Sequence, residues 1–133
     1  PDHLKAAGIS YIGDFVVDDR PCRVSTRHGP LIAVPYSVEL NDIPLLAIQH
    51  HRADEFVERA LLNLDRLAAE ARGDGPLGGA KVMGFAIHPY ITGVPHRIGS
   101  LERLLDAFMA RDDVVFMQGS EILDWYLETG DDA

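Results

Sequence analysis

The sequence predicts an α/β fold, in which short buried strands alternate with amphipathic helices. Residues 31–34 and 82–87 are short, mostly apolar runs, typical of strands that are buried on both faces. Residues 52–72 and 100–110 repeat apolar side chains every three or four positions, as a helix with one buried face does. Strands and helices that alternate in this way form parallel sheets with helical crossovers.

The first third of the chain carries the end of a helix and then strands. Residues 4–7, followed by Gly8, are typical of a last helical turn that stops at a glycine. A Gly-Pro turn is expected at residues 27–30. The strands expected in this part of the chain are residues 9–13, 22–25 and 31–34.

The remainder is expected to alternate helix and strand. The helix at 52–72 ends at the glycine-rich segment 73–76, and its predicted apolar face comprises Val57, Ala60, Leu61, Leu64, Leu67, Ala68 and Ala71. Ser100 and Ser120 are predicted N-caps of the last two helices. Their predicted core residues are Leu101, Leu104, Leu105 and Phe108, then Ile122, Trp125 and Tyr126. The strands expected here are residues 81–87 and 114–116.

Composition limits the classes of function. The chain has 133 residues, of which 47% are hydrophobic and 25% charged, an ordinary balance for one packed domain. Its formal net charge of −9 argues against binding to nucleic acid or to an anionic membrane, because both require clustered cations. Cys22 is the only cysteine, so a disulfide framework is excluded and a reducing, cytoplasmic location is expected. The first residues look like the inside of an element, so we expect further sequence upstream.

Ionisable and aromatic residues concentrate in the loops that follow the predicted strands. In parallel α/β folds the loops at the carboxyl ends of the strands carry the chemistry. His88 is the main candidate, because it ends a buried strand and an imidazole titrates near neutral pH. It could protonate a leaving group or stabilise an oxyanion, or it could be a hydrogen-bonded histidine at the rim of the core.

Carboxylates in two of these loops are further candidates. Asp14, Asp18 and Asp19 could hold a histidine in its charged form or orient a substrate amine, or they could form a solvated acidic loop. Asn41 and Asp42 follow another strand end, although an Asn-Asp pair is also common in turns.

Two further pairs contain histidine. Arg97, next to His96, could bind a carboxylate or a carbonyl oxygen, or be a surface charge. His50 and His51 are adjacent and do not face the same way, so they make a poor metal chelate. No HxxH, HxxxH or HExxH motif occurs, so we expect no complete metal site from this chain alone.

Four segments resemble the polysaccharide deacetylase (NodB-homology) family, in particular the branch with peptidoglycan deacetylase-like proteins and cofactor-independent allantoinases. Residues 11–21 are similar to its fourth motif region, and residues 31–42 to its next strand and loop. Residues 86–97 look like its last catalytic motif and the segment after it. Residues 119–126 resemble its closing helix, so the likeness covers nearly the whole chain in the expected order.

The resemblance implies a distorted (β/α) barrel, of which residues 1–133 would be a single partial domain, the C-terminal half. It implies that His88 protonates the leaving amine or stabilises the oxyanion, and that Asp14 or Asp18 tunes this histidine. The substrate-binding residues expected on this basis are Asp19, Tyr36, Asn41, Asp42, Tyr90, His96 and Arg97.

The implied reaction is hydrolysis of a non-peptide carbon–nitrogen bond, either N-deacetylation of a sugar or opening of a cyclic amide such as allantoin. The family's N-terminal half supplies an aspartate base and an Asp-His-His metal triad, so zinc, if used, would be held outside this chain. The expected partners are a small-molecule or saccharide substrate, the missing N-terminal half, and further copies in a homo-oligomer. Two alternatives stay open: a non-catalytic α/β binding or assembly module, and a self-contained small hydrolase.

Overall fold

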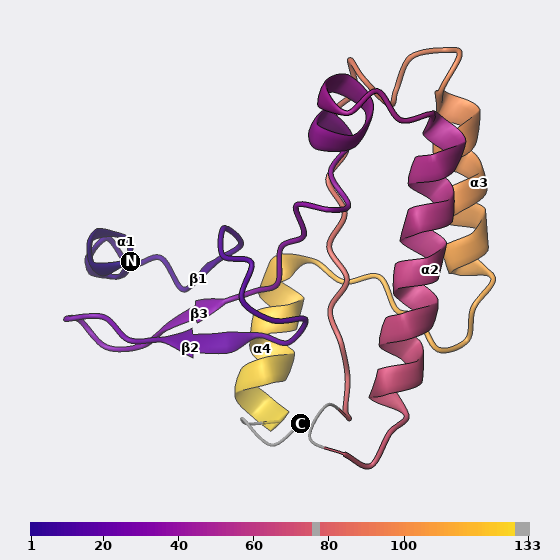
Figure 1. Cartoon of the computed structure of the whole chain (residues 1–133). Helices are drawn as coiled ribbons and strands as arrows, with labels where there is room; N and C mark the ends of the chain where they lie inside the picture. The colour runs from indigo at the N-terminus through magenta and orange to yellow at the C-terminus, as the bar shows by residue number, and fades with distance from the viewer. Residues whose placement is uncertain (76–77, 130–133) are drawn as a thin grey trace.

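The computed structural model describes residues 1–75 and 78–129 and has the predicted mixed α/β class. A short helix, α1 (Asp2–Ala6), comes first, and Gly8 follows it with a positive φ of 85°, as the predicted glycine stop requires. The described strands are β1 (Tyr11–Ile12), β2 (Cys22–Val24) and β3 (Leu31–Ala33). They form a small sheet in the order β1-β3-β2, which lies beside α4 (Gly119–Thr129) in Figure 1.

The sheet is mixed rather than wholly parallel. Strands β1 and β3 are parallel, with Tyr11 opposite Ile32, as predicted. Strands β2 and β3 are antiparallel, with Arg23 opposite Ile32, so the prediction of a parallel sheet was wrong for this pair. The physical reason is the length of the connection: a short turn can join antiparallel neighbours, whereas a parallel crossover needs a dozen or more residues.

Two helices pack against each other on the other side of the molecule (Figure 1). They are α2 (Ala53–Ala71) and α3 (Ile98–Met109), close to the predicted bounds. The predicted caps were wrong, because Ser100 and Ser120 lie inside helices and Arg97 is the N-cap of α3. Within α3, the Ser100 hydroxyl instead donates to Asp54 of α2 at 3.2 Å. Of the predicted break at 73–76, Pro76 lies outside the described residues.

A π-helical segment, η1 (Ile43–Ile48), was not predicted. Its N-cap is Asp42, and at its start the side-chain oxygen of Asn41 accepts the amide of Ile43 at 2.9 Å. Leu45 and Leu46 are the buried residues of the segment. An element of six residues is too short to show a helical repeat, so its sequence could only be assigned to a loop.

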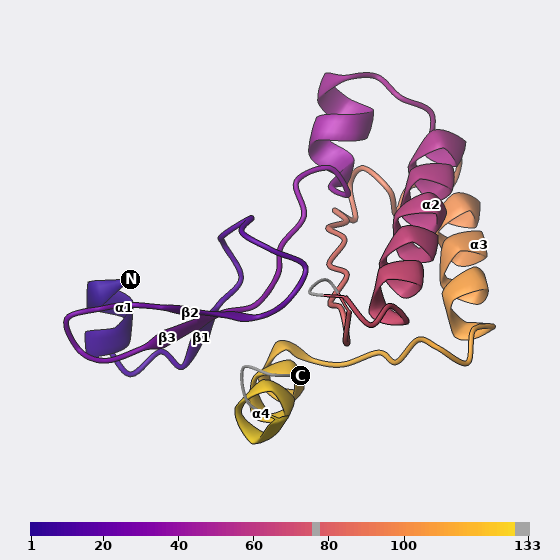
Figure 2. The same ribbon diagram turned by 60° about the horizontal axis from the view of Figure 1, so that its bottom comes forward.

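Two predicted strands, residues 81–87 and 114–116, are not formed as strands. The first is extended and lies between residues 36–42 and α2 in both views, but only Ala86 makes a bridge (Figures 1 and 2). Residues 114–116 are irregular, and Val115 and Phe116 are exposed. Apolar β-branched residues fit a strand, but a strand also needs neighbours that bind its backbone groups along its whole length. Residues 81–87 make such bonds at Val82 and Ala86, which is not the continuous pairing of a strand.

The main core comprises the side chains buried beneath α2 and α3 together with the segments these helices cover. Its members are Leu40, Leu45, Leu46, Phe56, Ala60, Leu64, Ile91, Leu104 and Phe108. Smaller clusters join β1 to β3, around Leu31, and β3 to α4, around Ile32 and Tyr126. Within the described ranges, no helix combines the length and the apolar character needed to cross a membrane.

Candidate active site

The candidate site forms where two short segments, residues 40–42 and 86–88, are joined by a parallel bridge. The amide of Ala86 donates to the carbonyl of Leu40 at 2.9 Å, and the amide of Asp42 donates to the carbonyl of Ala86 at 3.1 Å. Asn41 and Ala86 thereby form a parallel bridge. Leu40 is fully buried in the main core and anchors the first segment. The register places Asp42 and His88 at the same end of the two segments.

His88 and Asp42 are in direct contact. The imidazole Nδ1 lies 2.6 Å from Oδ1 of Asp42, and the backbone N–H of His88 donates to Oδ2 at 2.7 Å. The Asp42 side chain has no exposed surface, whereas 33% of the His88 side chain is exposed. A carboxylate in this position orients an imidazole and stabilises its charged form. The main sequence candidate therefore has both a carboxylate neighbour and an accessible side.

The loop after His88 folds back onto Asp42. The amides of Ile91 and Thr92 both donate to the carbonyl of His88 at 2.9 Å. This turn brings Thr92, which is buried, to Asp42, and its hydroxyl donates to Oδ2 at 2.5 Å. Asp42 therefore accepts hydrogen bonds from the backbone N–H of His88 and from the Thr92 hydroxyl, in addition to its contact with the imidazole.

Opposing effects act on the pKa of Asp42. Burial is the largest single effect and raises the pKa, because it removes the carboxylate from water. Hydrogen bonds from the Thr92 hydroxyl and from the His88 amide and ring act in the other direction, and the pKa of Asp42 is lowered overall. The carboxylate is therefore ionised at neutral pH, as a partner of a charged imidazole has to be.

Two residues predicted to bind substrate adjoin this pair, Asn41 and Tyr90, and a third, Tyr36, is bound to Asn41. The side-chain amide of Asn41 donates to the hydroxyl of Tyr36 at 2.8 Å, so these two residues bind each other. The ring of Tyr90 meets the His88 ring edge-on, with centroids 5.6 Å apart. Tyr90 is 70% exposed, so its ring is available to a molecule that approaches His88.

The predicted residues of the following loop do not contact the His88–Asp42 pair. The guanidinium of Arg97 donates to the carbonyl of Ile91 at 3.1 Å, and this hydrogen bond stabilises the loop that follows His88. His96 is exposed. Substrate binding by either residue stays a prediction.

The acidic loop does not supply the carboxylate that contacts His88. Asp14 and Asp18 are exposed, and Asp18 accepts the amide of Asp19 at 2.7 Å. The carboxylate beside the imidazole is Asp42 instead, because the parallel bridge brings it alongside His88. Other catalytic roles for Asp14 and Asp18 stay predictions.

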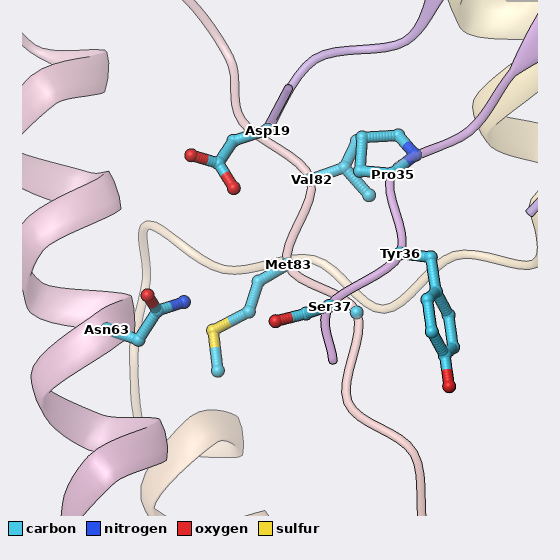
Figure 3. Close-up of a pocket in the computed structure, with 8 residues that line it drawn as sticks. Asp19, Pro35, Tyr36, Ser37, Asn63, Val82 and Met83 are labelled. Atoms are coloured by element: carbon cyan, nitrogen blue, oxygen red, sulfur yellow. The ribbon is translucent and has the colours of Figure 1, made fainter. Parts of the chain in front are cut away.

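Asp19 lines a small cavity, which Tyr36 lines as well. Figure 3 shows its carboxylate directed toward Asn63 and Met83, whereas the ring of Tyr36 points away from them. The space available to water is about 10 Å³, enough for roughly one molecule. Partial burial and the nearby charge of Asp18 raise the pKa of Asp19. Neither His88 nor Asp42 is among the lining residues, and substrate binding by Asp19 stays a prediction.

Protein metal sites are built from His, Cys, Asp and Glu side chains that lie close together. Over residues 1–75 and 78–129, no group of three His, Cys, Asp or Glu side chains is placed to hold a metal ion. His51 is bound to Glu55 and Gln49, each at 3.1 Å. The described residues alone therefore do not form a zinc site, and zinc held by ligands from outside this chain stays a prediction.

Sequence reasoning missed Thr92 and the pairing of Asp42 with His88. Asp42 was included among substrate-binding candidates, but the bridge that brings it to His88 lies outside any regular strand. Thr92 follows His88 by four residues, a spacing that a single tight turn brings together. A polar residue at that spacing in a strand-end loop is the one signal that could have indicated it.

Comparison with known proteins identifies the fold. No family model and no curated protein matches the chain. The structure of the PuuE allantoinase superimposes with a TM-score of 0.83 at 24% identity, over 96% of this chain and 41% of that one. A Mycobacterium smegmatis protein classed as a polysaccharide deacetylase gives a TM-score of 0.76 at 24% identity, over 97% and 45%. The chain spans less than half of either structure and has the fold of part of a NodB-type deacetylase or allantoinase barrel.

Proposed function

We propose that this chain supplies part of the active site of a hydrolase that cleaves a non-peptide carbon–nitrogen bond. The observation that carries the proposal is the His88 imidazole, which is bound at Nδ1 by the buried Asp42 and whose side chain is 33% exposed. Fold likeness to an allantoinase and to a protein classed as a polysaccharide deacetylase supports this choice of reaction, since both names denote hydrolysis of carbon–nitrogen bonds.

The proposed role of His88 is that of a general acid. When water adds to the carbonyl carbon, the carbon–nitrogen bond breaks only if the departing nitrogen gains a proton. The imidazolium of His88 gives its Nε2 proton to that nitrogen, while Nδ1 keeps its hydrogen bond to Asp42. The group that takes the proton from the attacking water lies outside the His88–Asp42 site.

Two substrate classes fit this chemistry: an N-acetylated sugar and a cyclic amide such as allantoin. Tyr90 supports either class, because an exposed aromatic ring beside the acid can pack against a sugar or against a planar ureide. Contributions from Asp19, Tyr36 and Asn41 to substrate binding are part of the proposal.

The proposed active site is completed by the rest of the barrel. Two exposed apolar runs, residues 15–17 and 115–117, each carry three consecutive large apolar side chains. Runs of this kind on a surface indicate contact with further protein. We assign that contact to the remaining part of the barrel, because both similar structures are more than twice as long as this chain.

The test is hydrolysis by the purified protein and by its His88→Gln variant, on acetylated chito-oligosaccharides and on allantoin. Glutamine keeps much of the shape and polarity of histidine but cannot donate a proton as an acid. We expect kcat to fall on the order of 10²- to 10⁴-fold. His28→Gln is the matched control, because His28 is exposed in the turn between β2 and β3, and its rate should equal the wild-type rate.

Other results would point elsewhere. Equal rates for wild type and His88→Gln would remove His88 from the chemistry. No hydrolysis of any carbon–nitrogen substrate by the full-length protein, with binding of a saccharide retained, would favour the non-catalytic module.

A further inference from the structure

Thr92 is a buried polar residue that the proposed reaction does not use directly. Its side chain and backbone are 98% covered, and its hydroxyl is directed at Oδ2 of Asp42, at 2.5 Å. The same oxygen accepts the backbone N–H of His88 at 2.7 Å. Two donors therefore engage Oδ2 and leave Oδ1 for the imidazole Nδ1, which lies 2.6 Å away.

This arrangement restricts the Asp42 carboxylate to one orientation. If the carboxylate turned about its bond to Cβ, the Thr92 hydroxyl would lose its acceptor in a buried position, at a cost of about 1–3 kcal/mol. The turn that presents Thr92 is itself tightly packed, since a Cβ on Gly93 would lie 2.6 Å from the carbonyl oxygen of Pro89. The tight turn after His88 thus fixes the position of Thr92, and the Thr92 hydroxyl in turn fixes the orientation of the Asp42 carboxylate.

An oriented carboxylate selects one form of the neutral imidazole. Ionised Asp42 can only accept hydrogen bonds, so the nitrogen that faces it has to carry the proton. The other groups around the ring do not oppose this choice: Tyr90 presents an aromatic ring at 5.6 Å, and Nε2 has no hydrogen bond within the described residues. A neutral His88 then carries its proton on Nδ1 and leaves the Nε2 lone pair on the accessible side.

We infer that Thr92 is a positioning residue, which fixes the Asp42 carboxylate and through it the Nδ1-protonated form of neutral His88. The catalytic consequence rests on the proposed function: after His88 has given its Nε2 proton to the departing nitrogen, Nε2 is directly ready to take a new one. The inference about protonation concerns the His88–Asp42–Thr92 group alone and needs no substrate.

Nuclear magnetic resonance of the full-length protein, labelled with ¹⁵N at histidine, tests the first part. The ring nitrogen shifts and their couplings to carbon-bound protons identify which nitrogen carries the proton, at a pH where His88 is neutral. His88→Gln assigns the signals. We expect the wild-type protein to show protonated Nδ1, the opposite of the preference of free histidine, and a wild-type protein with protonated Nε2 would overturn the inference.

Variants of Thr92 test the second part. Thr92→Val keeps the shape and removes the hydroxyl, so we expect the Nε2-protonated form to appear and kcat to fall roughly 10- to 100-fold with KM little changed. Thr92→Ser restores the hydroxyl and should restore both readouts. Thr26→Val is the matched control, because the Thr26 hydroxyl donates within the turn between β2 and β3.

The outcomes separate this inference from the proposed function. A folded Thr92→Val protein with the wild-type ring spectrum and wild-type kcat would overturn the role of Thr92, even if hydrolysis is established. A loss of rate that Thr92→Ser does not restore would also overturn it. Conversely, a shifted tautomer in Thr92→Val with no hydrolysis by any form of the protein would support the positioning role and reject the proposed reaction.

Discussion

The two sides of this molecule differ in how completely their side chains are covered. Beneath α2 and α3, the main core encloses Leu40 and Ile91, which lie next to the site residues in the chain. Elsewhere, the two exposed apolar runs, residues 15–17 and 115–117, are not covered by any element of the described residues, and Val115 is 76% exposed. The group that holds His88 belongs to the covered side, where Asp42 has no exposed surface.

A catalytic site has to position its groups and also has to be open to substrate, and in this molecule the covered side and the exposed surface meet these two requirements separately. Positioning needs rigid support, since small displacements of a catalytic group lower its effectiveness, and the covered side gives that support. Access needs a surface open to solvent: the His88 side chain is 33% exposed, and Tyr90 beside it is 70% exposed. The following predictions test whether the covered side positions His88 and whether the exposed runs are contact surfaces.

The largest effect is expected for Asp42→Asn. An amide cannot accept from all of the donors around Asp42, and it stabilises a charged imidazole far less than a carboxylate does. We expect kcat to fall on the order of 10³- to 10⁴-fold, and unfolding free energy to fall by about 1–3 kcal/mol. Assays of hydrolysis and denaturant titrations measure the two effects.

Asp18→Asn, in the exposed acidic loop, is the comparison for Asp42→Asn. Because Asp18 is exposed, its replacement should change stability by no more than about 0.5 kcal/mol. A loss of kcat as large as that of Asp42→Asn would show that the acidic loop tunes His88, in agreement with the expectation from sequence and against the observed pairing.

The next effect concerns the support itself. Leu104 of α3 is fully buried in the main core, so Leu104→Ala should lower the unfolding free energy by about 2–5 kcal/mol. Val115→Ala removes apolar atoms from an exposed run and should change the unfolding free energy by no more than about 0.5 kcal/mol. Chemical denaturation of both variants provides the measurement, and equal losses would mean that the two sides are equally packed in solution.

The difference between the covered and the exposed side also explains which elements could be predicted from the sequence. Helices α2 and α3 were predicted because their apolar repeat reflects burial within the chain, as for Leu64 and Leu104, which both belong to the main core. Residues 114–116 have the composition of a strand but no partner among the described residues. A local pattern indicates which face is apolar, but whether a neighbour is present to pair with it depends on the whole assembly.

For the candidate site, sequence reasoning found the imidazole but not its surroundings. His88 was identifiable because an ionisable residue at the end of an apolar run is unusual. Its pairing with Asp42 depends on one isolated bridge between segments 46 residues apart, and the contact of Thr92 depends on a turn. Contacts of these kinds leave no periodic pattern, so the sequence alone does not single them out.

The exposed runs lead to a prediction about association. If they are contact surfaces, the isolated 133-residue chain should self-associate at micromolar concentration, because exposed apolar surface is removed from water on contact. A double variant, Val17→Lys with Val115→Lys, should associate less, since each charge would be costly to bury. Sedimentation velocity measures both proteins, and a monodisperse wild-type monomer would argue against the assignment.

The smallest effect is expected for the ion pairs at the C-terminal end of α3. Arg111 binds both Asp65 and Asp113, and Arg72 reaches Asp113 at 3.1 Å, so these pairs tie α2 to the segment after α3.

The hydrogen bond from Arg111 lowers the pKa of Asp113 from 3.8 to about 2. A lowered folded-state pKa contributes stability above the unfolded value, and this contribution is lost as pH falls from about 4 to about 2. Asp113→Asn should therefore lower Tm slightly at neutral pH. The difference in Tm between the variant and the wild type should become smaller as pH falls through that range. Thermal melts at several pH values measure this, and a difference in Tm that is the same at pH 2 and pH 7 would show that the ion pairs do not contribute through charge.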